Sequence, residues 1–291
     1  MLRFVPLLVF LALLSAPLAH AQDDAVERGR YLFAAGGCLG CHTAKGGALL
    51  AGGRALKTPF GTFFGPNITP DPQYGIGGWS DEDFLRALRE GVSPEGDFYY
   101  PAFPYASFTG MTDADILALK AYIFSLTPVA EPSRDHELDF PYNIRVGLAP
   151  WRWRYFKEGP LEPDPAHDEA WNRGAYLVKA LVHCGECHTP RDSFGGPETD
   201  LAYAGTTDGP EGAIVPNITP DPETGIGDWS AGDLDFFLSL GMLPDGDVTG
   251  DVMYEVIEHG TSKLTAADRE AIAVFLQALP PIRHAVERKK P

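Results

Sequence analysis

The pentapeptide Cys-x-x-Cys-His occurs twice in this chain, at residues 38–42 and 184–188, and the two copies use all four cysteines of the sequence. Two thiols on one helical turn can each add to a vinyl group of the same porphyrin, and the adjacent histidine can bind the iron as its proximal ligand. We therefore predict two covalently bound haem c groups. The attaching thiols would be those of Cys38 and Cys41 and of Cys184 and Cys187, with His42 and His188 on the two irons.

Two other uses of the cysteines compete with this interpretation. Four cysteines in an oxidising compartment can form two disulfides, and two Cys-x-x-Cys pairs can bind zinc through four thiolates. Neither alternative requires a histidine directly after each pair. A redox-active pair of the thioredoxin type would need a βαβ context, which the sequence lacks.

The motifs belong to a longer duplication. Residues 66–72 (PNITPDP) recur at 216–222, and the Gly-Ile-Gly and Trp-Ser blocks that follow recur at the same separation of 150 residues. An Arg-Gly-x-Tyr-Leu segment precedes each motif, at residues 28–32 and 173–177. The same order of parts, repeated with small insertions, indicates one single-haem domain written twice.

Each copy predicts the same sequence of helices. A first helix is expected at about 24–38 and 168–184, directly before the motif. A short helix follows Ser80 and Ser230, each with an aspartate at the capping-box position, and an amphipathic helix covers 113–126 and 266–279. No alternating run is long enough to predict a sheet, so we expect an all-α protein.

The segment between the two copies, residues 131–166, is rich in proline and aromatic residues. A flexible linker would instead be rich in glycine and serine. We expect its aromatic side chains to pack against both domains and to hold them in a fixed relation. They could also merely complete the core of the first domain. The expected division is residues 22–130, the linker 131–166, a second domain at 167–285 and a basic tail at 286–291.

The N-terminus has the features of a secretory signal peptide. Arg3 precedes a short apolar run, and Ala19-His20-Ala21 is a small-x-small cleavage site. We expect residues 1–21 to be removed after Ala21; an uncleaved membrane anchor is the alternative. Covalent haem attachment takes place outside the bacterial cytoplasm, so we expect a periplasmic protein that contacts a membrane only peripherally, through its partner.

The formal net charge of −17 argues against nucleic acids and anionic lipid surfaces as partners. It favours a partner with a positive or large apolar contact surface, although acidity also serves solubility.

The distal iron ligands are predicted from the methionines. Methionine at this position raises the potential and suits electron transfer, whereas an open position suits peroxide or gas chemistry. Met111 is the only methionine of the first domain, so we predict that it binds the first iron. Its match in the repeat is Leu264, so we predict Met253 for the second iron, with Met242 and His259 as alternatives.

The repeated blocks resemble a known family. Residues 67–80, 100–105 and 111–113, with the segment around the second motif, resemble the cytochrome c subunit of membrane-bound quinoprotein alcohol dehydrogenases. The resemblance implies two tandem class I cytochrome c-like domains. It also implies ligation by the residues named above, and transfer of electrons from a dehydrogenase to quinone or a further cytochrome. That family has three haems and a membrane attachment; with two motifs, this chain is expected to be a two-haem relative.

We therefore expect a periplasmic dihaem electron-transfer protein, not itself an enzyme, between a dehydrogenase and a cytochrome or oxidase of the respiratory chain. A dihaem peroxidase or thiosulfate-oxidising enzyme is the alternative. The latter type uses a cysteine as iron ligand, and no cysteine is left over here.

Overall fold

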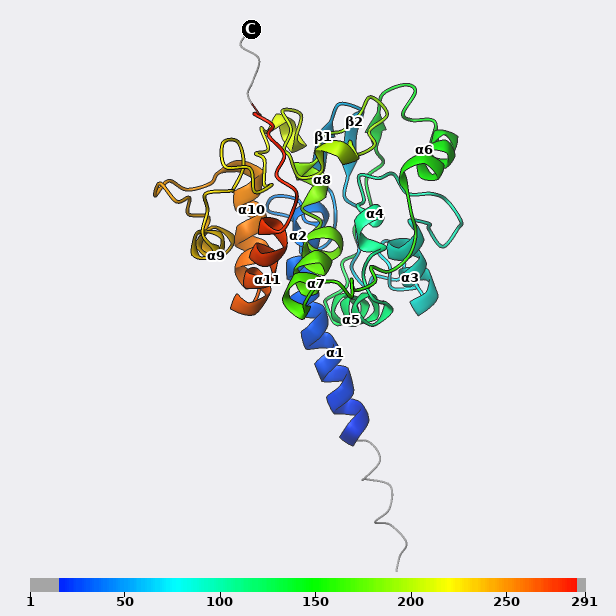
Figure 1. Cartoon of the computed structure of the whole chain (residues 1–291). Coiled ribbons are helices and arrows are strands. Elements are labelled where there is room, and N and C mark those ends of the chain that lie inside the picture. Colours follow the sequence, from blue (N-terminus) through cyan, green and yellow to red (C-terminus); the bar gives the residue numbers. More distant parts are fainter. Residues whose placement is uncertain (1–15, 287–291) are drawn as a thin grey trace, which may run out of the picture.

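The computed structural model describes residues 16–286, and its helices pack as two halves on either side of a central seam (Figure 1). We use the name first half for the described residues up to 130 and second half for those from 167. The first 15 residues, which hold most of the predicted signal peptide, and the basic tail from residue 287 lie outside the described part. Within that part, no helix is long and apolar enough to cross a membrane.

The described part of the first half contains five helices. They are α1 (Ala16–Ala35), α2 (Cys38–His42), α3 (Asp81–Glu90), α4 (Tyr105–Phe108) and α5 (Asp113–Phe124). The predicted capping box is confirmed, since the Ser80 hydroxyl accepts from the amide of Asp83 while the Asp83 carboxylate accepts from Ser80. Gly91 ends α3 with φ 63°, a conformation that glycine adopts without steric cost.

The second half repeats these parts. Its first helix is α7 (Glu169–Tyr176), continued by the π-helical turn η2 (Leu177–Leu181), and α8 (Gly185–His188) carries the second motif. Then follow α9 (Ala231–Leu240), α10 (Asp251–His259), the short turn η5 (Thr261–Lys263) and α11 (Ala266–Gln277). Ser230 and Asp233 form the second predicted capping box, and Thr265 caps α11 as expected. Two further short turns are η3 (Thr199–Leu201) and η4 (Pro210–Gly212).

A small sheet corrects the expectation that the chain forms none. Strands β1 (Ala55–Thr58), β2 (Gly61–Phe64) and β3 (Glu137–Leu138) pair antiparallel in the order β1-β2-β3, with Ala55 opposite Phe64 and Gly61 opposite Leu138. Strands of two to four residues are too short for alternation to show in a sequence. The third strand comes from the linking segment, which therefore adds to the first half.

The rest of the linking segment contains the turn η1 (Arg145–Gly147) and helix α6 (Leu148–Tyr155), neither of which was predicted. Its aromatic side chains divide between several environments. Tyr155 donates to Asp192 of the second half at 2.6 Å, and the ring of Phe156 packs edge-on against Tyr105 of the first half with centroids 5.1 Å apart. Trp153 instead faces solvent.

In each half the first and last helices cross at a glycine. A Cβ added to Gly29 in α1 would lie 1.9 Å from the carbonyl oxygen of Ala118 in α5. A Cβ on Gly174 in α7 would lie 2.0 Å from the carbonyl oxygen of Ala271 in α11. Only glycine permits these close crossings, which explains why the glycine of the repeated Arg-Gly-x-Tyr segment occurs in both copies.

The two halves are joined at the seam by a reciprocal pair of hydrogen bonds. Tyr31 of α1 donates to Asp268 of α11 at 2.5 Å, and Tyr176 of α7 donates to Asp115 of α5 at 2.5 Å. Each carboxylate is also bound by the arginine of its own half, Asp115 by Arg28 and Asp268 by Arg173. The Arg-Gly-x-Tyr repeat therefore holds its own half with the arginine and the opposite half with the tyrosine.

Candidate haem attachment sites

Each Cys-x-x-Cys-His motif forms a single helical turn. In the first half the motif is helix α2, and in the second half Cys184 directly precedes α8, so the two cysteines of each motif are three residues apart on one face. No disulfide joins any of the four cysteines, all of which lie among the described residues. Within residues 16–286, no group of three or more histidine, cysteine or acidic side chains is arranged to hold a metal ion, as a zinc site would require.

Burial raises the pKa of the Cys38 and Cys184 thiols to about 12 and that of Cys187 to about 11. A redox-active or disulfide-exchanging pair needs at least one thiol whose pKa is lowered. These cysteines are therefore poorly suited to thiol redox chemistry, and their placement on one turn fits covalent attachment of a porphyrin.

The two motif histidines are oriented in the same way. His42 Nδ1 lies 2.8 Å from the carbonyl oxygen of Pro66, and His188 Nδ1 lies 2.8 Å from that of Pro216. A carbonyl can only accept, so each Nδ1 carries the hydrogen and each Nε2 is left as the iron-binding nitrogen. Desolvation lowers the pKa of both rings, which favours the neutral imidazole that a metal requires.

The repeated PNITPDP segments therefore have a role that was not predicted from the sequence: the carbonyls of their first prolines orient the two motif histidines. The asparagines that follow attach each loop to the segment after the last helix of the same half. The Asn67 amide donates to the carbonyls of Val129 and Glu131, each at 2.8 Å, and Asn217 donates to that of Ile282 at 2.7 Å.

A tight loop is hydrogen-bonded to the end of each attachment turn. The amide of Gly52 donates to the His42 carbonyl at 2.8 Å, and that of Gly205 donates to the His188 carbonyl at 2.7 Å. A Cβ on Gly65 would lie 1.8 Å from the carbonyl oxygen of Cys41. The chain therefore holds the cysteines and the histidine in place before any ligand is considered, and the set of two thiols and one imidazole fits haem c.

The structure does not support Met111 as an iron ligand. Met111 is fully buried in the hydrophobic core, and Leu264 takes the same place in the second half with 4% exposure. Arg89 donates to the Met111 carbonyl at 2.7 Å, as Arg269 does to the Leu264 carbonyl at 2.6 Å. Because a leucine fills the same position, packing at the seam accounts for the burial of Met111. The prediction of Met111 rested on its being the only methionine of the first half.

Met253 lies on α10, partly buried, and remains the predicted ligand of the second iron. Met242 lies earlier, in a bridge with Val248 at the surface, and His259 ends α10 in an exposed position.

Phe103 stands in the first half where Met253 stands in the second. Before this point the separation is 150 residues, because the amide of Tyr99 donates to the carbonyl of Gly91 and the amide of Thr249 donates to that of Gly241, each at 2.8 Å. After this point Gly110 and Gly260 show the same separation, since both lie against the first helix of the opposite half. A Cβ on Gly110 would lie 2.9 Å from the Ala180 side chain, and one on Gly260 would lie 3.3 Å from the carbonyl oxygen of Ala34, the residue that corresponds to Ala180. The two halves therefore differ in the residue at this position.

The two attachment turns approach each other at the seam. His183, directly before Cys184, lies with Nε2 3.3 Å from the Gly36 carbonyl oxygen, just before Cys38. Ser107 of the first half donates to Glu186, inside the second motif, at 2.6 Å. Groups attached to the two turns would therefore be neighbours held in fixed positions.

Comparisons with known proteins agree with this geometry. Residues 26–127 match the family described as cytochrome c. The chain is 44% identical over 265 residues to a dihaem c-type cytochrome of Cereibacter sphaeroides, covering 88% of this chain and 86% of the relative.

Two larger relatives are subunits of dehydrogenases. The chain is 42% identical to the fructose dehydrogenase cytochrome subunit of Gluconobacter japonicus, covering 90% of this chain and 54% of that subunit. It is 39% identical to the cytochrome c subunit of the quinone-dependent alcohol dehydrogenase of Gluconacetobacter polyoxogenes, covering 92% and 58%. The chain thus spans little more than half of these two relatives. On this evidence the chain belongs to the family of c-type cytochromes that includes dihaem cytochromes c and the cytochrome c subunits of dehydrogenases.

Proposed function

We propose that this chain carries two haem c groups in the periplasm and transfers electrons from a dehydrogenase to a cytochrome or oxidase of the respiratory chain. The observation that carries the proposal is the pairing at one seam of two attachment turns, each with its histidine turned by a carbonyl. Two domains, residues 22–130 and 167–285, would each hold one haem, and residues 131–166 would link them.

Haem, when bound, supplies an iron that changes its charge by one electron. The four motif cysteines would fix the two porphyrins, and His42 and His188 would be the proximal ligands through Nε2. The Pro66 and Pro216 carbonyls keep these rings in orientation and make them more basic ligands. We propose Met253 as the distal ligand of the second iron.

A dehydrogenase as electron donor is supported by the relatives, two of which are named as cytochrome subunits of dehydrogenases. The location is supported by the sequence, since residues 1–21 have the form of a signal peptide cleaved after Ala21. The acceptor is proposed on chemical grounds, because an electron carrier needs an outlet of higher potential.

The proposal is tested on the protein matured in a bacterial periplasm. The intact mass should correspond to a chain that starts at Gln22 and carries two haems, and a redox titration should give two reversible one-electron steps. The proposal would be contradicted by a chain that carries one haem, or by a chain that retains residues 1–21 and stays in the cytoplasm.

Phe103 favours a second candidate, a dihaem peroxidase, because a phenylalanine at the distal position leaves an iron without a protein ligand on that side. In that case the ferric first haem would be high-spin, bind cyanide and turn over peroxide. An electron carrier with an open first haem would bind cyanide without turnover, so a peroxidase assay separates the two functions.

A further inference from the structure

Helix α6 and its flanks contact the C-terminal end of α3 and the turn after it in the first half. Arg152 donates to the carbonyl at the end of α3, that of Glu90, and its guanidinium lies 4.4 Å from the ring centroid of Phe98. Arg145 donates to the Phe98 carbonyl at 2.7 Å. Val92, which bridges to Phe98, is only partly exposed under this cover.

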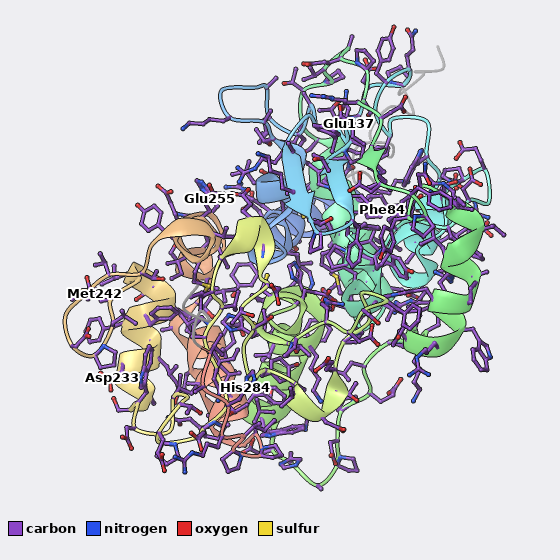
Figure 2. The ribbon with its side chains drawn as sticks, turned by 90° about the horizontal axis from the view of Figure 1, so that it is seen from above. Phe84, Glu137, Asp233, Met242, Glu255 and His284 are labelled. Carbon is purple, nitrogen blue, oxygen red and sulfur yellow. The ribbon has the colours of Figure 1, made fainter. Side chains whose placement is uncertain are left out.

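Among residues 16–286, no helix equivalent to α6 covers the same face of the second half. Met242 bridges to Val248 as Val92 bridges to Phe98, again 150 residues on. Leu240, at the position of Glu90, is 59% exposed, Met242 is 42% and Val248 is 64% exposed. Figure 2 shows Met242 at the outer edge of the second half, next to α9. Figure 1 places α6 and α9 at opposite edges of the molecule.

This uncovered face is also more apolar than the covered one. Leu240 replaces Glu90, and Phe236, 57% exposed, replaces Arg86. Exposed large apolar side chains that lie together on one face are typical of interaction sites. We define the α9 face as Phe236, Leu240, Met242, Val248 and Tyr254, all of which are exposed.

We propose that the α9 face docks a short helix of the partner dehydrogenase that carries arginine and aromatic side chains, as α6 does on the first half. The inference rests on the proposed function. Its template is within the chain, since α6 and its flanks cover the equivalent surface of the first half with guanidinium groups on backbone carbonyls and an aromatic ring beside them. Asp245 and Asp247, exposed in the turn before Val248, match a basic helix by charge.

Docking here would bring the partner to the second haem. Tyr254 of the α9 face is the neighbour of Met253, the proposed distal ligand, on α10. Electrons would then be exchanged with the partner at the second half, and the first half, whose equivalent face is closed by α6, would be reached through the seam.

The test uses the matured holoprotein and a synthetic peptide of residues 145–156 as the probe. The peptide should bind, and the double variant Leu240→Glu with Val248→Glu should raise its dissociation constant about tenfold or more, because a carboxylate is then buried in an apolar contact. Phe194→Glu, which changes an exposed phenylalanine outside the α9 face, should bind as the wild type does. A peptide with glutamate in place of Arg152 should bind more weakly.

Absence of binding, or equal binding by the double variant, would overturn the inference. So would a change from oligomer to monomer in the double variant on sedimentation, because a second copy would then occupy the face. The haem spectra and the two redox steps should be the same in every variant. If binding fails while those steps remain, only the docking inference fails; if the steps are missing from the wild type, the proposed function fails.

Discussion

Tyr176 and Tyr31 each reach across the seam to a carboxylate of the opposite half, so removing either hydroxyl should weaken the whole molecule. The hydroxyl of Tyr176 donates to Asp115, whose side chain is 2% exposed, and that of Tyr31 donates to Asp268, whose side chain is 12% exposed. A hydrogen bond to a charged group contributes about 1.5–3 kcal/mol. Each Tyr→Phe change should therefore cost about 2 kcal/mol of unfolding free energy.

For a chain of this size, 1 kcal/mol lowers Tm by about 2–4 °C, so each single variant should melt about 4–8 °C below the wild type. Tyr176→Phe should cost more than Tyr31→Phe, because Asp115 is the more completely buried carboxylate. The two sites share no partner, so the double variant should lose roughly the sum.

Scanning calorimetry of the holoprotein measures these shifts. Tyr74→Phe is the matched control, since Tyr74 is exposed and its hydroxyl makes no hydrogen bond with the described residues. Tyr31→Phe and Tyr176→Phe variants that melt with this control would refute the reasoning. A double variant that melts in two separate steps would instead show that the tyrosines couple the two halves.

Three further predictions follow from single positions. Met253→Leu should remove the methionine-iron absorption of the oxidised protein and lower one reduction potential, whereas Met111→Leu, which copies Leu264, should leave both unchanged; the opposite result would restore Met111 as a ligand. Burial raises the pKa of Asp268, but hydrogen bonds from Arg173 and Tyr31 outweigh it and hold that pKa below its usual value. The Asp268 carboxylate therefore stabilises the fold above about pH 4 and loses this effect as the pH falls through the lowered pKa. Asp268→Asn should melt lower at pH 7 but lose less of its Tm between pH 5 and pH 3, and a parallel fall in both proteins would contradict this. Gly29→Ala should prevent α1 and α5 from packing closely and lower the free energy of unfolding by about 3 kcal/mol or more. Gly232→Ala, whose Cβ would lie 3.6 Å from its nearest neighbour in the exposed start of α9, should leave that free energy unchanged or raise it, as urea unfolding of both variants would show.

The sequence predicted what depends on neighbours along the chain. The capping boxes at Ser80 and Ser230 and the helix end at Gly91 need only a few residues at fixed spacing, and they are present as expected. The attachment motifs are local in the same sense. The reciprocal bonds of Tyr31 and Tyr176 were missed because they form only when two separately folded parts meet, although their segment was visible as a repeat.

The distal iron ligand of the first half is difficult to predict for the same physical reason. Met111 was chosen because it was the only methionine of its half, but spacing along the chain does not say which way a side chain points. The register of the repeat would have helped, since a separation of 150 residues pairs Phe103 with Met253 and no gap is needed between residues 249 and 260. The small sheet could not be foreseen, because β3 is supplied by a segment outside the repeat.

The duplication explains why the differences between the halves are informative. A duplicated fold gives each half the same attachment turn, carbonyl-bound histidine and glycine crossing, so what still differs need not follow from the shared fold. Two differences fall in the second half: Met253 replaces Phe103, and among the described residues no helix covers the α9 face as α6 covers the end of α3. A thioether ligand stabilises the reduced iron and so raises its potential, and an open apolar face admits a partner. If Met253 binds the second iron and the partner docks on the α9 face, the second haem is the contact with the partner and the first haem is reached through the seam. Blocking the α9 face should then slow the reduction of both haems by the dehydrogenase, whereas blocking the first haem alone should slow the reduction of that haem only.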